Sequence, residues 1–140
     1  AFGIGIIDND IIDKYDIRQA SFMAMKKAIN NLPIKPDFVL VDGIDIIPDF
    51  DIDQQAIIKG DSLSISIAAA SIIAKVTRDK LLKQYHKLYP LYNFNKNKGY
   101  ATEDHIEAIR KYGCCDIHRK TFDPITTILR ESGQEEFFLI

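Results

Sequence analysis

Runs of apolar residues along the chain outline three expected strands. Phe2 to Ile7 is an isoleucine-rich run that predicts a strand, and Phe38 to Val41 is a continuous apolar run typical of a strand buried on both faces. A shorter strand is expected over Gln55 to Lys59. The last two runs are followed by Asp42-Gly43 and Gly60-Asp61, which are typical turn residues and end the strands there.

Helical spacing of the apolar residues accounts for most of the remaining chain. Helices are expected from the cap-type residues 8–10 to about residue 30, over about 65–85, over 103–112 up to Gly113, and from Pro124 with Asp123 as its N-cap. In the second of these, Ala69, Ile73 and Val76 share one face. The order strand, helix, strand, strand and then mostly helix predicts an α/β fold with at least one parallel crossover.

Composition and charge narrow the class of protein. With 140 residues, 46% hydrophobic and 27% charged, the chain is expected to form one globular domain or most of one. A net charge of -2 gives no global basic footprint, so nucleic-acid binding would require a local basic patch. The adjacent Cys114 and Cys115 cannot bridge distant elements, which favours a reducing cytoplasmic compartment. No apolar run has the length of a transmembrane helix, and we expect a monomer without membrane contact.

Two aspartates follow expected strands at the positions where α/β proteins bind ligands. Asp42 comes directly after Val41, and Asp61 follows the next strand. Carboxylates at neighbouring strand ends could share one Mg²⁺ ion, which prefers oxygen ligands. Spacing alone, however, favours a simpler role for both residues as turn residues.

The acidic run at Asp49, Asp51 and Asp53 has the alternation of a calcium-binding loop. Such a loop requires Gly at its sixth position and Glu at its twelfth. Here these positions hold Gln54 and Gly60. A calcium loop is therefore excluded, and a solvated acidic loop is expected.

The central stretch carries a resemblance to a known family. Lys59-Gly60-Asp61-Ser62, followed by the segment 67–79 (Ile-Ala-Ala-Ala-Ser-Ile-Ile-Ala-Lys-Val-Thr-Arg-Asp), resembles the core of ribonuclease HII and is less similar to type HIII. Other family segments follow in the same order, and the resemblance extends from Ile4 to about Leu129. These segments are Ile17 to Ala20, Val41-Asp42-Gly43, Lys98-Gly99-Tyr100 with His105, Gly113, and His118 to Pro124.

The resemblance implies a fold and a chemistry. The family has a ribonuclease H-like mixed sheet flanked by helices with a helical C-terminal part, here expected as residues 1–90 and 91–140. Its members cut the RNA strand of RNA–DNA hybrids, and cut DNA 5′ to embedded ribonucleotides, with Mn²⁺ or Mg²⁺ held by four carboxylates. Asp42 and Asp61 match the third and fourth carboxylates, and Lys75 matches an active-site lysine. This suits two-metal-ion phosphodiester hydrolysis, whereas without the resemblance Lys75 would simply pair with Asp79.

Substrate-binding residues are also implied. Tyr100 matches the tyrosine that stacks at the ribonucleotide–deoxyribonucleotide junction and senses the 2′-hydroxyl, the group that separates RNA from DNA. Lys98, with Lys96, and the cluster of His118, Arg119 and Lys120 would contact phosphates. For a tyrosine in a loop, packing is the alternative role, and for each basic cluster the alternative is a solvated face.

One departure from the family concerns the first two carboxylates. The family places them in an Asp-Glu-Ala-Gly-Arg-Gly type motif on an N-terminal strand, and these 140 residues contain neither an Asp-Glu pair nor Gly-Arg-Gly. The glutamates, Glu103, Glu107, Glu131, Glu135 and Glu136, all lie in the C-terminal third. The family would place that motif and several strands before Ala1. We therefore expect an exposed sheet edge and little or no activity from these residues alone.

Two alternative functions remain at the level of sequence. The chain could be a non-catalytic nucleic-acid-binding member of the same family that keeps Tyr100 and the basic loops. It could also be an unrelated hydrolase that uses Ser71 and Lys75. These two residues are four apart, which is not the Ser-x-x-Lys spacing, so this second alternative is weak.

Overall fold

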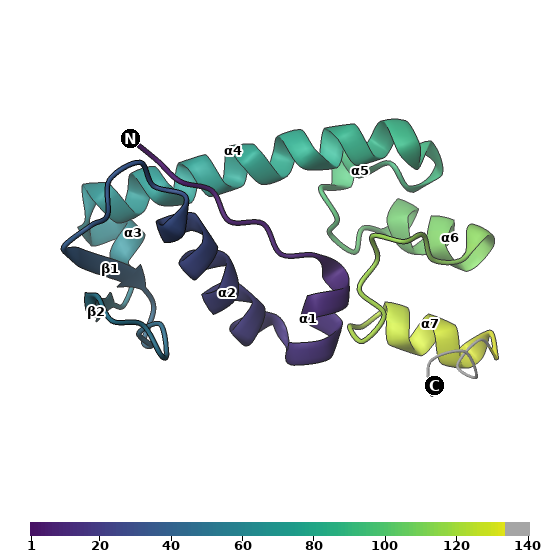
Figure 1. The fold of residues 1–140 in the computed structure, drawn as a ribbon. Helices are drawn as coiled ribbons and strands as arrows, with labels where there is room; N and C mark the ends of the chain where they lie inside the picture. Colours follow the sequence, from purple (N-terminus) through teal and green to yellow (C-terminus); the bar gives the residue numbers. More distant parts are fainter. Residues whose placement is uncertain (134–140) are drawn as a thin grey trace. The chain divides into compact units, whose positions relative to one another are not determined.

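The computed structural model describes residues 1–133 of the chain (Figure 1). The chain divides into two units, Ala1–Thr77 (unit 1) and Arg78–Ile140 (unit 2), and residues 78–133 are the described part of unit 2. The long helix α4 (Ile65–Leu88) begins in unit 1 and ends in unit 2. Glu135, Glu136 and the end of the predicted C-terminal part lie outside the described residues. Each unit is described by itself below.

The predicted N-terminal strand is wrong, because residues 2–7 join no sheet. This segment packs instead on helix α2 (Ile17–Asn30). The side chains of Lys27 in this helix and of Asn31, its C-cap residue, donate to carbonyl groups of the segment at 3.0 and 2.8 Å. A Cβ atom at Gly3 or Gly5 would lie 2.0 or 1.9 Å from a backbone oxygen of that helix. The two glycines therefore allow an approach that any side chain would block.

The expected N-terminal helical region consists of two helices. Helix α1 (Asn9–Tyr15) ends at Asp16, whose φ of 72° breaks the helical path before α2 begins. The Asp16 carboxylate accepts hydrogen bonds from the backbone of Arg18 and Gln19 at 2.7 and 3.0 Å. It thereby satisfies two of the amide groups that the first turn of a helix leaves without partners.

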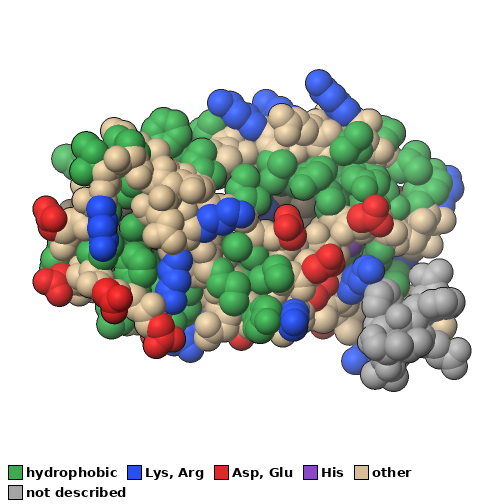
Figure 2. Space-filling view, in the orientation of Figure 1, with side chains coloured by type: hydrophobic (Ala, Val, Ile, Leu, Met, Phe, Trp, Pro, Cys, Tyr) green, Lys and Arg blue, Asp and Glu red, His purple; other side chains and the backbone are tan. Residues whose placement is uncertain are grey.

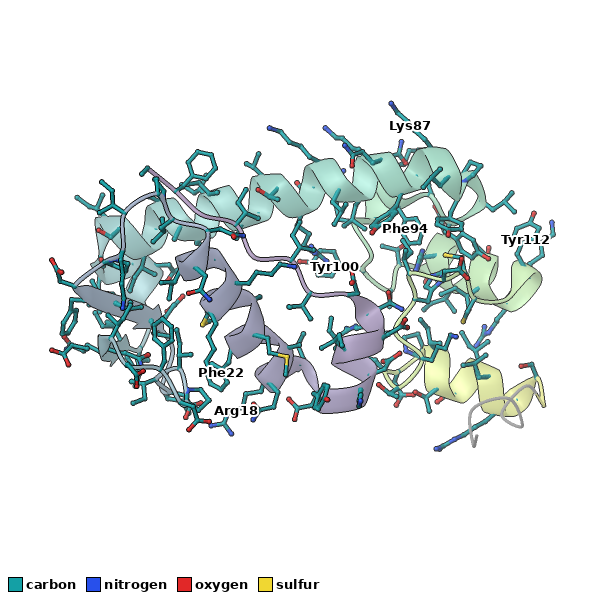
Figure 3. All side chains as sticks on the ribbon, in the orientation of Figure 1. Arg18, Phe22, Lys87, Phe94, Tyr100 and Tyr112 are labelled. Atoms are coloured by element: carbon teal, nitrogen blue, oxygen red, sulfur yellow. The ribbon has the colours of Figure 1, made fainter. Side chains whose placement is uncertain are left out.

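The sheet of unit 1 has two parallel strands, as the predicted crossover requires. Strand β1 (Phe38–Asp42) pairs with β2 (Asp53–Ile57) from Phe38↔Asp53 to Asp42↔Ile57. The prediction that β1 is buried on both faces is wrong, because within β1 only Val41 is buried. Val41 belongs to a small core that it forms with Phe22, labelled in Figure 3, and Ile47.

Unit 2 is helical and has the larger core. After α4 come a 3₁₀ turn η1 (Pro90–Tyr92) and helices α5 (Phe94–Asn97), α6 (Glu103–Tyr112) and α7 (Ile125–Glu131). Helix α6 has the predicted bounds, while α7 begins one residue late, with Pro124 instead of Asp123 at its N-cap. The buried core residues are Tyr92, Phe94, Ala108, Ile109, Ile125, Ile128 and Leu129.

Helix α4 is longer than predicted and largely exposed. Among its 24 residues only Ile67 is buried, and Val76, on the face expected to pack, is 46% exposed. None of the helices in the described part of the chain combines the length and the apolar character that crossing a membrane requires.

Candidate active site

The two strand-end aspartates lie at the same edge of the sheet. Because β1 and β2 are parallel neighbours, their carboxyl ends coincide. Asp42 is the last residue of β1, and Asp61 lies in the first turn of helix α3 (Gly60–Leu63), which follows β2. Both side chains are exposed. The structure therefore places the two carboxylates where the sequence predicted them, at neighbouring strand ends.

Gly60 connects the two strand ends. Its amide donates a hydrogen bond to Asp42 Oδ1 at 2.8 Å, so the residue directly before Asp61 is tied to Asp42. Gly60 is buried, and a Cβ atom there would lie 2.5 Å from Ile67 Cδ1 and 3.3 Å from Asp42 Oδ1. Lys59, with φ of 56°, turns the chain into this contact. A side chain at position 60 would therefore require the end of the Ile67 side chain to move and would crowd the Asp42 carboxylate.

Asp42 and Asp61 offer the type of ligand atom that a divalent cation binds, but only two side chains supply it. Carboxylate oxygens are the ligands that Mg²⁺ and Mn²⁺ prefer, and two carboxylates with waters and substrate oxygens are a known arrangement for Mg²⁺. Residues 1–133 contain no group of three or more His, Cys, Asp or Glu side chains placed to hold a metal ion. Asp42 and Asp61 are therefore the ligands that unit 1 offers at this edge.

Lys75 lies on α4 within unit 1, and its side chain is exposed. It forms no ion pair with any described residue, so the pairing with Asp79 that helical spacing suggests is not formed. Ser71 is exposed on the same helix. The ammonium group of Lys75 is thus available to an external anion.

Tyr100 lies in the loop before α6 and is 65% exposed (Figure 3). The loop is held by the buried Asn97, which donates to the Tyr92 carbonyl at 2.7 Å and accepts from the Gly99 amide at 2.8 Å. The Lys98 ammonium donates to the carbonyl of Asn95 in the same loop. An ordered loop therefore presents the phenol ring to solvent, which opposes a role in packing.

The expectation that His118 contacts phosphate is not supported by the structure. His118 is 5% exposed, and burial, together with the neighbouring His105, lowers its pKa to about 4. A ring that stays neutral in the interior offers no positive charge to a phosphate. The basic cluster is thereby reduced to Arg119, whose guanidinium lies 4.2 Å from the Phe122 ring, and Lys120.

The two histidines form a hydrogen-bonded chain that the sequence did not reveal. The Cys115 amide donates to His118 Nδ1 at 2.9 Å, so His118 carries its proton on Nε2, which faces His105 Nε2 at 3.3 Å. His105 Nδ1 lies 3.0 Å both from the Tyr92 carbonyl oxygen and from Asn97 Nδ2. Burial raises the pKa of Cys115 to about 11, which keeps the thiol neutral. One signal pointed to this core: His105 lies three and four residues before Ala108 and Ile109, on the apolar face of α6.

Comparison with known proteins identifies the family. The family model described as ribonuclease HII matches residues 2–125. The chain belongs to the ribonuclease HII family. Its relatives include the ribonuclease HII of Caldanaerobacter subterraneus subsp. tengcongensis, 58% identical over 87% of this chain and 50% of that protein, and the ribonuclease HII of Clostridioides difficile, 58% identical over 86% and 47%. The chain thus spans about half the length of these ribonuclease HII relatives, whose name is that of a nuclease.

A solved structure supports the fold. The crystal structure of the ribonuclease H2 from Pyrococcus horikoshii OT3 matches 89% of this chain and 66% of that one, with a TM-score of 0.66 and 24% sequence identity. At this identity the likeness concerns the fold alone. Together with the mixed α/β architecture, it confirms the predicted ribonuclease H-like fold class.

Proposed function

We propose that this chain supplies part of the active site of an endonuclease. The enzyme hydrolyses the RNA strand of RNA–DNA hybrids and cuts DNA 5′ to embedded ribonucleotides. The observation that carries the proposal is the pair of exposed carboxylates, Asp42 and Asp61, joined through the Gly60 amide at one edge of a parallel sheet. Membership of the ribonuclease HII family supports assigning the pair to nuclease chemistry.

In this proposal Asp42 and Asp61 are ligands of Mn²⁺ or Mg²⁺. Two such ions, when bound, would activate water and stabilise charge on the phosphodiester. The Gly60 amide orients Asp42, because a carboxylate oxygen that accepts a hydrogen bond is held in one direction. Lys75, exposed and without an ion pair in the described chain, would neutralise phosphate charge as a point charge.

The substrate contacts belong to unit 2. Tyr100 would stack on the ribose side of the ribonucleotide junction, and Lys98 and Arg119 would contact the phosphate backbone. The exposed ring of Tyr100 supports its role. We place the protein in the cytoplasm as a monomer, and the two free cysteines are consistent with a reducing compartment.

We further propose that the 140 residues by themselves cut poorly. Two carboxylates hold two divalent cations weakly, because the oxygen ligands that Mg²⁺ lacks must then come from water. The ribonuclease HII relatives are about twice as long, so their remaining sequence has room for further ligands. Measurable metal-dependent cutting by these residues alone would contradict this part of the proposal.

The test is a chimera in which the chain is joined to the part of the Caldanaerobacter protein that it does not match. The chimera should cut a DNA duplex with one ribonucleotide when Mn²⁺ or Mg²⁺ is present. Asp42→Asn or Asp61→Asn should lower the rate on the order of 100-fold or more, because the ions contribute several kcal/mol to transition-state stabilisation. Asp51→Asn, in the exposed acidic loop of the same unit, is the matched control and should leave the rate unchanged. Unchanged cutting by both site variants would reject the metal site.

A second candidate function is nucleic-acid binding without catalysis. It is favoured by the exposed ring of Tyr100, which lies in unit 2, whereas the carboxylates of Asp42 and Asp61 lie in unit 1. Duplex binding that is insensitive both to Mg²⁺ and to Asp42→Asn, with a chimera that never cuts, would support this function over the nuclease.

A further inference from the structure

Arg78 lies against Tyr100, and neither the sequence motifs nor the proposed metal site gives it a role. The centre of its guanidinium group is 4.9 Å from the centre of the phenol ring. Its Nη2 atom donates a hydrogen bond of 2.8 Å to the carbonyl oxygen of Lys98, two residues before the tyrosine. Both contacts lie within unit 2. One side chain therefore touches the ring and the backbone that carries it.

The loop is shaped to receive this arginine. Lys98 and Gly99 both have positive φ, 52° and 76°, and this turn brings the Lys98 carbonyl within reach of Arg78. An added Cβ atom at Gly99 would lie 3.8 Å from Arg78 Nη2. Asn97 fixes the loop from its buried side, through the Gly99 amide and the Tyr92 carbonyl. Arg78 thus holds the exposed side of a loop whose inner side is already fixed.

We propose that Arg78 is a positioning residue that holds the Tyr100 ring in the orientation in which it meets the ribose of the substrate. This rests on the proposed role of Tyr100. Arg78 belongs to the 24-residue helix α4, whereas Tyr100 lies outside any helix or strand. A side chain anchored on a helix therefore restricts the orientation of a ring that is carried by a loop. A ring that is already oriented loses less conformational freedom on binding, which raises the affinity for the substrate that it recognises.

Arginine suits this task and lysine does not. The planar guanidinium group can face an aromatic ring and donate a hydrogen bond in its own plane at the same time. A lysine at the same position keeps the positive charge, but it has no flat surface, and all its N–H donors lie on one nitrogen atom. Arg78→Lys therefore separates positioning of the ring from attraction of phosphate by charge.

The binding test uses the 140-residue chain and two duplexes of one sequence, one all-DNA and one with a single ribonucleotide. Wild type should prefer the second, and Arg78→Lys should reduce the ratio of the two affinities about two- to fivefold, the size of an exposed cation–π contact. Arg110→Lys, an exposed arginine of α6, is the matched control and should leave the ratio unchanged. In a Tyr100→Ala background, Arg78→Lys should change the ratio no further.

Other outcomes would show whether the positioning role of Arg78 or the proposed role of Tyr100 is wrong. Equal weakening of both duplexes by Arg78→Lys, also in the Tyr100→Ala background, would mean that Arg78 is a phosphate contact and would overturn the inference. An unchanged ratio in Arg78→Lys, when Tyr100→Ala does change it, would also overturn it while leaving Tyr100 its role. No preference in the wild type, or none lost in Tyr100→Ala, would reject the proposed role of Tyr100 and with it the inference.

A second measurement tests the contact without any ligand. In a chain with ¹³C-labelled tyrosines, the signal of Tyr100 among the six is assigned from its loss in Tyr100→Phe. Arg78→Lys should shift that signal and leave those of the distant tyrosines in place, which also shows that the variant is folded. A Tyr100 signal that does not move would show that the arginine does not hold the ring.

Discussion

The two units of the chain bury their apolar residues to different extents. In unit 2, seven buried residues form one cluster that includes the aromatic rings of Tyr92 and of Phe94, the latter labelled in Figure 3. In unit 1, the corresponding cluster is Phe22, Val41 and Ile47, whereas large apolar side chains such as Ile44 and Ile65 are 76% and 91% exposed. Figure 2 shows apolar side chains spread over much of the face that it draws.

The difference separates two kinds of polar site. His105 and His118 of unit 2 lie inside a dense core, where each of their ring nitrogens has a partner, and their arrangement is explained by hydrogen bonding in the interior. Asp42 and Asp61 of unit 1 are exposed at a sheet edge with little core behind them. Burial thus marks the histidines as structural and leaves the aspartates available for chemistry.

The largest expected effect is a truncation in the core of unit 2. Ile109→Ala removes a side chain that is 2% exposed from a cluster of seven, and should cost about 4 kcal/mol in the free energy of unfolding. Ile47→Ala removes one that is 1% exposed from a cluster of three and should cost only about 2 kcal/mol, because a looser site can collapse around the cavity. Urea unfolding followed by hydrogen exchange in each unit measures both. Equal costs would show that the two cores are packed equally well.

The next effect concerns the close contact at the strand ends. Gly60→Ala forces a Cβ atom against Ile67 and disturbs the hydrogen bond to Asp42, and should cost about 2 to 3 kcal/mol in unit 1. In an Ile67→Ala background the same substitution should cost at least about 1 kcal/mol less, since the nearest clash is gone. The comparison of the four proteins by urea unfolding measures this coupling. Additive costs would show that the clash with Ile67 is not the cause.

Local patterns predicted the elements whose causes are local. Helix α6 begins and ends where its acidic first turn and Gly113 indicate, and the parallel strand pair appears with Asp42 at its carboxyl end. The burial of a side chain depends on residues distant in the sequence, so it was harder to predict from local patterns. Phe38 and Leu40 belong to an apolar run yet are exposed, because β1 has one neighbouring strand and little packed over it in the described chain.

Site residues divide in the same way. Asp42 could be placed from one strand and one glycine, since its position follows from the strand that precedes it. His118 stood beside Arg119 and Lys120 in a basic sequence, and only the folding of His105 and Cys115 against it shows that it is interior. Arg78 and Tyr100 are 22 positions apart, so no local pattern connects them. Contacts that depend on tertiary packing were beyond prediction from one sequence.

The pH dependence of unit 2 tests the interior character of His118. Its pKa is lowered to about 4 from the ordinary value of 6.5, so below pH 6.5 the unfolded chain takes up a proton that the native ring refuses. Stability is therefore complete above about pH 6.5 and falls as the pH is lowered to about 4, by on the order of 2 kcal/mol after allowance for solvent screening. Urea unfolding of the wild type and of His118→Gln across this range should show the variant losing that part of the slope. An identical slope in both proteins would place the titration elsewhere.

The smallest expected effect lies at the junction of α1 and α2, where unit 1 relies on local bonding instead of a large core. Asp16→Ala removes the acceptor of two amide hydrogen bonds and puts a side chain without that compensation at a φ of 72°, which should cost about 1 to 2 kcal/mol. Asp16→Gly loses the acceptor but tolerates the backbone conformation, so it should cost only a few tenths of a kcal/mol. Asp16→Asn, which keeps an oxygen at the cap and has nearly the same shape as aspartate, is the matched control and should be near neutral. Thermal unfolding of the three variants ranks them. If Asp16→Ala and Asp16→Gly lowered the stability equally, the backbone conformation at Asp16 would carry no strain. The side-chain cap alone would then account for the contribution of Asp16 to stability at this junction.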